Sequence, residues 1–224
     1  MESISGRCSE HGVLAIDYAR MMKFTTTATF LLSATILFVG CSKNAIKSPP
    51  LGFLSQPDLM KQQGDGTWQY TAATIDWSKY TSVFVAPVAI ADDAYDAGVY
   101  GSVEDLPGLA ATFQSDLQTA LTKKFAAATN AGPNTLVVKA QITKADPNAT
   151  ALNIAPQSQI MGRGYGYGQV AIEIVDGGTG ALLYEFAGVQ NTSRFSAEKM
   201  SVWGSLEKSF KDWSSQIAKF CGIS

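Results

Sequence analysis

QVAIEIVDGGTGALLYEFAG, residues 169–188, consists of two alternating segments on either side of a glycine-rich turn. In each segment every second residue is apolar, a period of two that is typical of a strand with one buried face. The glycines of DGGTG, residues 176–180, adopt positive φ at little cost and suit a tight turn. The stretch therefore predicts a β-hairpin. The predicted buried face comprises Val170, Ile172, Ile174, Leu182, Tyr184 and Phe186, and the polar face carries Gln169, Glu173 and Glu185.

Two further strands are predicted upstream of this hairpin. TSVFVAPVAI, residues 81–90, is apolar on both alternating faces, as expected for an interior strand. Pro87 has no amide hydrogen to donate, so a strand end or a bulge is expected there. TLVVKAQIT, residues 135–143, alternates like the hairpin, with Lys139 and Gln141 on its polar face.

Two long helices are predicted from apolar residues at three- and four-residue spacing. The first has Asp105 as its N-cap, runs through Phe125 and is ended by the turn at 130–133. The second has Ser196 as its N-cap and is stopped by Gly222. Its apolar stripe, which we assign to the core, comprises Met200, Trp203, Leu206, Phe210, Trp213, Ile217 and Phe220.

The order of the predicted elements is β-α-β-β-β-α. A helix between the first two strands favours a parallel, right-handed connection. With the closing hairpin, this order predicts a mixed sheet of about four strands. Because several strands have one polar face, both helices are expected mainly on the other face, which makes an α+β domain.

The N-terminal part contains MKFTTTATFLLSATILFVGC, residues 22–41. A positive residue, Lys23, is followed by an uncharged apolar run and a small residue, Gly40, directly before Cys41. This is the pattern of a signal peptide, and the run is shorter than the roughly 20 apolar residues of a membrane-spanning helix. Phe38–Cys41 resembles the lipobox of bacterial lipoproteins, in which the cysteine is acylated. A core helix that ends at a structural cysteine is the alternative.

These features divide the chain into three parts. We expect residues 1–40 to be the signal peptide, with 1–20 an over-extended start upstream of Met21 or Met22. Residues 41–52 would be a lipid tether, and residues 53–224 a single α+β domain. Ser42 differs from the aspartate that commonly retains lipoproteins in the inner membrane, so the outer membrane is expected, with the domain in the periplasm.

Composition excludes several kinds of site from the mature chain. The only histidine is His11, so Ser-His and Cys-His nucleophiles and histidine-ligated metals are excluded downstream of Cys41. Cys221 is the one cysteine left once Cys41 carries lipid, so no internal disulfide forms. The net charge of −2 gives no basic excess for nucleic acid. We expect no metal, no cofactor and no catalytic residue.

The segment from Asp146 to Gly168 is the predicted binding surface. It spans roughly 20 residues between two strands, a length that is usually functional or disordered. Arg163, Tyr165 and Tyr167 are its candidate contact residues, because tyrosine offers a large amphipathic surface. A loop without a partner is the alternative. The glycines at 162–168 do not make a dinucleotide fingerprint, since they precede a strand and open no helix.

An acidic loop after the first strand contains Asp92, Asp93 and Asp96. Three carboxylates could hold Ca²⁺, but the glycine and the closing glutamate of an EF-hand are missing. A solvated loop is therefore the favoured interpretation.

Three short motifs resemble a family of bacterial lipoproteins, domain of unknown function 3313. They are Gly52–Ser55, WSKYTSVFVAPV at residues 77–88, and the turn Asp176–Gly180. The resemblance implies an envelope lipoprotein of a Gram-negative bacterium. It supplies no catalytic residue.

Together these observations predict an acyl-anchored outer-membrane lipoprotein that faces the periplasm and acts as a non-enzymatic binding or assembly module. Its expected partners are the membrane, through its acyl chains, and an envelope protein or glycan. The alternative is a carboxylate-dependent hydrolase of envelope glycans, because paired carboxylates are the acid–base groups that remain without histidine.

Overall fold

The computed structural model describes residues 52–64, 66–95, 101–149, 166–191 and 201–223. Its long helices are α1 (Leu106–Leu121) and α4 (Gly204–Phe220), and its short 3₁₀ helices are η1 (Pro57–Leu59), η2 (Trp77–Lys79) and η3 (Val103–Asp105). Its strands are β1 (Lys61–Gly64), β2 (Thr67–Thr71), β3 (Ser82–Val85), β4 (Ala89–Ile90), β5 (Ala126–Ala127), β6 (Thr135–Asp146), β7 (Tyr167–Asp176) and β8 (Leu182–Asn191).

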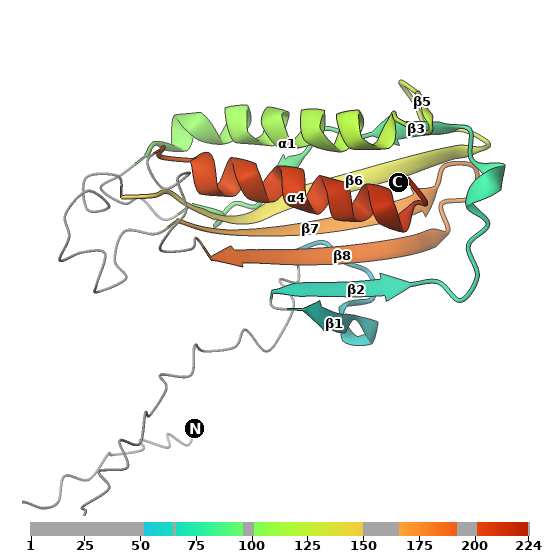
Figure 1. Ribbon diagram of the computed structural model, residues 1–224, viewed down its shortest axis with the longest axis horizontal. Coiled ribbons are helices and arrows are strands. Elements are labelled where there is room, and N and C mark those ends of the chain that lie inside the picture. The colour runs from blue at the N-terminus through green and yellow to red at the C-terminus, as the bar shows by residue number, and fades with distance from the viewer. Residues whose placement is uncertain (1–51, 65, 96–100, 150–165, 192–200, 224) are drawn as a thin grey trace, which may run out of the picture. The chain divides into compact units, whose positions relative to one another are not determined.

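The strands form one mixed sheet in the order β1-β2-β8-β7-β6-β3-β5, and β4 also pairs with β6 (Figure 1). The predicted hairpin is confirmed, since β7 and β8 are antiparallel neighbours. The predicted parallel pair is confirmed as well, because β3 lies parallel to β6 with Val83 opposite Leu136. Pro87 lies between β3 and β4, so the predicted interior strand is interrupted there.

The prediction of about four strands is wrong, because the described part of the chain has an eight-stranded sheet. The strands β1 and β2 were missed, since β1 is exposed and polar and Trp68 is the one fully buried residue of β2. These strands are held by pairing with β8 and with each other rather than by an apolar face of their own. The strand β5 is only Ala126–Ala127, too short for any periodic signal.

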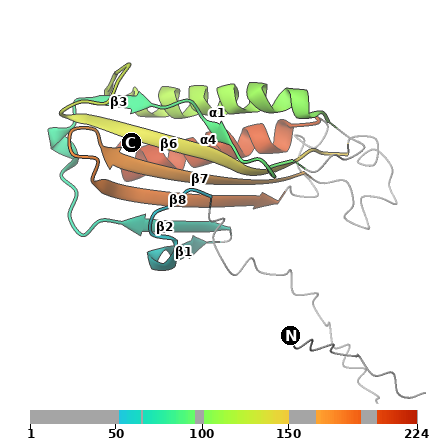
Figure 2. The same cartoon turned by 180° about the vertical axis from the view of Figure 1, so that it is seen from behind.

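Both helices cover one face of the sheet, as predicted; the two opposite views show the helices in front and then behind (Figures 1 and 2). Their apolar stripes meet in the core, where the rings of Phe113 and Phe210 stack with centroids 4.4 Å apart. The buried members of these stripes are Leu106, Leu109, Phe113, Leu117, Leu121, Leu206, Phe210, Trp213 and Ile217.

Asp105 is the N-cap residue of α1 and Gly222 follows the C-cap of α4, as predicted, but the other two helix ends need correction. The second helix begins at Gly204, and its N-cap residue is Trp203, not Ser196. The indole Nε1 of Trp203 donates to Asp105 Oδ2 at 2.9 Å, so this tryptophan joins the starts of both helices. The first helix ends at Leu121. Phe125, which was predicted to belong to this helix, lies instead in the connection between α1 and β5, where its side chain is buried.

The turn between β7 and β8 is fixed to η2 through one carboxylate. Asp176 Oδ1 accepts from the amides of Gly178 and Thr179 at 2.9 Å each. Its Oδ2 accepts from Lys79 Nζ at 2.9 Å and from Tyr80 Oη at 2.8 Å. The bonds from Lys79 and Tyr80 hold the pKa of Asp176 well below its usual range.

Asp176→Asn is therefore expected to lower the free energy of unfolding at neutral pH by about 1–3 kcal/mol, since hydrogen bonds to a charged acceptor are lost. Because folding depresses this pKa, the contribution is present above about pH 4 and is lost as the pH falls. Urea unfolding at several pH values should show the gap to the wild type closing in acid. As a control, Asp212→Asn removes an exposed ion pair with Lys208 on α4, and its free energy of unfolding should stay within about 0.5 kcal/mol of the wild type. An equal gap at pH 3 and pH 7 would contradict this role.

Candidate functional site

Two glutamates form a buried carboxylate pair on the sheet face opposite the helices. Glu173 of β7 and Glu185 of β8 are directly opposite each other in the antiparallel register. Their neighbours Ile172, Ile174 and Phe186 belong to the core beneath the helices, so alternation places the two carboxyls on the other face. Glu173 is 5% exposed and Glu185 is 0% exposed. The predicted polar face is therefore correct in position, but its carboxyls are not solvated.

The pair is covered by residues Gly52–Gln56, which we call the strap. Glu185 Oε1 accepts from the backbone amides of Ser55 at 2.6 Å and Gln56 at 2.9 Å. The Ser55 hydroxyl donates to Glu173 Oε1 at 2.5 Å. The strap therefore donates hydrogen bonds to both carboxyls, although it lies more than a hundred residues away from them in sequence.

Gly52 is the start of the strap and lies tightly against the sheet. It has a φ of +45°, a conformation that favours glycine. A Cβ at this position would be 2.8 Å from Ala171 Cβ and 3.0 Å from Gln141 Oε1. Any larger residue would push the strap away from β6 and β7, which gives a steric reason for glycine at the start of this motif.

The charge state of the pair follows from its burial. Desolvation raises the pKa of Glu185, the amides of Gln56 and Ser55 lower it, and the neighbouring Glu173 carboxyl raises it again. Lys139 Nζ lies 3.9 Å from Glu173 Oε2, but the lysine side chain is half exposed and compensates little. The arrangement can bind amide and hydroxyl donors and can hold a proton. Those donors are supplied by the chain itself.

A small apolar cluster lies beside the carboxyl pair on the same face. Its buried members are Trp68, Ala187 and Val189, and Leu54, Met60 and Tyr167 pack against it. The strap is thus held by its Leu54 side chain as well as by the glutamates. Tyr167, which was predicted to be a contact residue away from any core face, instead belongs to β7 and packs in this cluster, where its hydroxyl accepts from Gln169 Nε2.

The other predicted site residues can be placed as follows. Cys41, Arg163 and Tyr165 lie outside the described residues. The segment predicted as a long binding loop is shortened at both ends, because β6 extends to Asp146 and β7 begins at Tyr167.

Two glycines of the 162–168 run serve close packing. The Gly166 amide donates to Asn148 Oδ1 at 2.7 Å. A Cβ on Gly168 would lie 2.3 Å from Leu206 Cδ1 of α4. In this part of the run, glycine allows β7 to pass beneath α4.

The acidic loop and Cys221 can be placed in part. Asp92 and Asp93 are exposed, Asp96 is outside the described residues, and no acidic, histidine or cysteine cluster suited to a metal occurs in the part of the chain that is described. Cys221 is fully buried, and burial raises the pKa of its thiol to about 12. Of the helices in the described ranges, none has the length and apolar character needed to cross a membrane.

Comparisons with known proteins concern the family and the fold. The model of the DUF3313 family, described as a protein of unknown function, matches residues 50–217. No curated protein matches. The PelC dodecamer from Paraburkholderia phytofirmans is similar with a TM-score of 0.42 and 12% identity, over 70% of this chain and 97% of that chain.

Two other solved structures show a similar degree of likeness. A hypothetical protein from Chlamydia trachomatis has a TM-score of 0.40 and 12% identity, over 63% of this chain and 98% of that chain. A DUF4136 family protein from Bacteroides thetaiotaomicron has a TM-score of 0.37 and 10% identity, over 73% of this chain and 98% of that chain. At these identities no activity follows from the likeness.

Proposed function

The chain belongs to the DUF3313 family of proteins of unknown function, and from this premise we propose that it is an acyl-anchored outer-membrane lipoprotein that acts as a non-enzymatic binding or assembly module in the periplasm. Its partner would be an envelope protein or an envelope glycan. The anchor would be Cys41, joined to the domain by the tether at residues 41–52.

The observation that carries this proposal is the strap. It begins at Gly52, where the predicted tether ends, and its Ser55 and Gln56 amides are bonded to the buried Glu185. A tether joined at this point would pull on the sheet through several buried contacts rather than through a frayed end. The strap lies on the face opposite the helices, which leaves the layer of α1 and α4 available to a partner.

The same contacts favour a binding module over a glycan hydrolase. A glycosidase needs two carboxyls separated by room for the sugar and, in inverting enzymes, a water molecule. Here Glu173 accepts from Ser55 Oγ and Glu185 from two amides, so a substrate would first have to displace the strap. A displaced strap would also disconnect the tether from the sheet.

Cys41→Ala is the variant that tests the anchor. We expect it to be unprocessed, or to leave the membrane fraction almost completely, because stable anchoring needs two or more acyl chains. Fractionation of cells grown with labelled palmitate measures both processing and location. Ser42→Ala is the matched control and should keep both label and location.

Labelled palmitate on the Cys41→Ala chain would contradict acylation at this residue. Recovery of the wild-type chain at the density of the inner membrane would contradict the proposed outer-membrane location, while leaving the anchor itself intact.

A further inference from the structure

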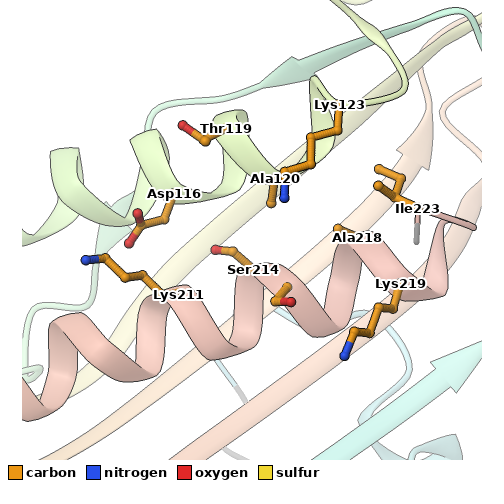
Figure 3. Close-up of a pocket in the computed structure, with 10 residues that line it drawn as sticks. Asp116, Thr119, Ala120, Lys123, Lys211, Ser214, Ala218, Lys219 and Ile223 are labelled. Atoms are coloured by element: carbon orange, nitrogen blue, oxygen red, sulfur yellow. The ribbon is translucent and has the colours of Figure 1, made fainter.

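A groove of about 310 Å³ runs between α1 and α4 on the face away from the strap. Its walls include Asp116 and Lys123 from the side of α1, and Lys211, Ser214 and Lys219 from α4. Figure 3 shows Lys211 and Asp116 facing each other across one end, and Lys123 reaching into the space from the end of α1. This volume is at the lower end of the range for small-molecule sites.

The groove is lined by three lysines and one aspartate, so it carries a net positive charge in a chain whose net charge is −2. Within the described residues, the ion pairs closer than 4.0 Å use Lys79, Lys139 and Lys208. The lysines of the groove, Lys123, Lys211 and Lys219, are exposed and take part in none of these pairs. An anionic group between the helices would therefore lie beside Lys123 and Lys219, which line the same end of the groove (Figure 3).

The groove also contains polar oxygens with no hydrogen-bond partner among the described residues. They are Asp116 Oδ2 and Ser214 Oγ, and Ser214 is only 1% exposed. Burial raises the pKa of Asp116, and Lys211 opposes this shift. An unpaired buried polar group costs free energy, and a ligand hydroxyl that bonds to it removes that cost. A ligand with hydroxyls next to its anionic group satisfies both features of the groove.

We propose that the groove between α1 and α4 binds an acidic sugar unit of an envelope glycan. The sugar carboxylate lies at the end of the groove near Lys123 and Lys219, and its hydroxyls bond to Asp116 and Ser214. The choice of a glycan as partner rests on the proposed function, which places the chain in the envelope. The charge and hydroxyl requirement rests on the groove alone.

The test is calorimetric titration of the full chain in detergent micelles with three probes. Oligogalacturonate supplies carboxylates and hydroxyls, oligoglutamate supplies carboxylates alone, and maltotetraose supplies hydroxyls alone. We expect oligogalacturonate to bind at least about tenfold more tightly than either other probe, a difference of about 1.4 kcal/mol. Equal binding of oligoglutamate, or no binding of oligogalacturonate, would overturn the proposal.

Variants then locate the binding. Lys123→Gln and Lys219→Gln should each weaken oligogalacturonate binding about three- to tenfold, whereas Lys208→Gln, on α4 but outside the groove, should change it less than about twofold. Ser214→Ala should weaken binding without lowering the melting temperature, because it removes an unpaired group. Equal losses at all three lysines would indicate unspecific charge attraction and refute the site. A wild-type chain that is acylated but does not bind oligogalacturonate would refute this inference alone and leave the proposed anchor intact.

Discussion

Replacing Trp213 with alanine is expected to lower the free energy of unfolding by about 3–5 kcal/mol, the usual cost of removing a large buried aromatic side chain. Trp213 is 2% exposed and contacts the rings of Phe113 and Phe210. Its indole also covers Gly188 of β8, where a Cβ would lie 2.7 Å from the ring. The side chain therefore joins α4 to α1 and to the sheet at once.

Urea unfolding of the two proteins measures this difference, provided that the slope of the transition is unchanged. Val103→Ala serves as the control, because Val103 is 56% exposed and its loss should stay within about 0.5 kcal/mol. A loss of less than about 1 kcal/mol for Trp213→Ala would show that this side chain contributes little to the core, and it would contradict the packing of α4 described above.

Replacing Glu185 with alanine is expected to release the strap and to cost about 2–3 kcal/mol, because the Ser55 and Gln56 amides both lose a buried acceptor. Burial raises the pKa of Glu185 most, and repulsion from the Glu173 carboxylate raises it further. The alanine variant removes this repulsion, which offsets part of the cost. Limited proteolysis of the folded chain should then cut near residues 52–56 in the variant and spare the wild type.

Glu185→Gln separates the charge from the hydrogen bonds, since its amide oxygen still accepts from both amides. Folding raises the pKa of Glu185. The stability that protonation of this carboxyl contributes is therefore fully present below about pH 4.3, the ordinary pKa of glutamate, and is lost as the pH rises through the higher pKa of the folded state. The Gln variant has no such loss. Its stability relative to the wild type should therefore increase with pH, and a difference that stays constant from pH 4 to pH 8 would contradict the buried carboxyl.

The elements that could be predicted from the sequence are those with a local signal. The hairpin at 169–188 alternates over two full segments, and the stripe around Phe210 keeps one period over several turns. The strands β1 and β2 have no such signal, because their stability comes from pairing with β8. A periodic pattern reports only local sequence, so it cannot predict strands that form by pairing with a distant segment of the chain.

The carboxyl pair illustrates the same limit at the candidate site. Alternation placed Glu173 and Glu185 on the polar face, and that face is correct. Their burial depends on the strap, which lies more than a hundred residues upstream, so no local pattern reports it. One signal was available, since two glutamates directly opposite in a hairpin repel each other and call for a compensating partner.

The short motifs of the family have physical roles in this structure. Gly52–Ser55 forms most of the strap, and Ser55 contacts both glutamates. Tyr80 of the WSKY motif donates to Asp176 at the hairpin turn. In this structure, both motifs fix distant segments of the chain to the sheet.

Hydrogen exchange of the Ser55 and Gln56 amides, followed by NMR in the full chain, measures most directly whether the carboxyl pair holds the strap. In the wild type both amides should be protected, and Glu185→Ala should accelerate their exchange about 30- to 150-fold, the equivalent of 2–3 kcal/mol, while the amides of β7 and β8 keep most of their protection. Unprotected Ser55 and Gln56 amides in the wild type, or equal exchange rates in the two proteins, would show that the strap is not held by Glu185.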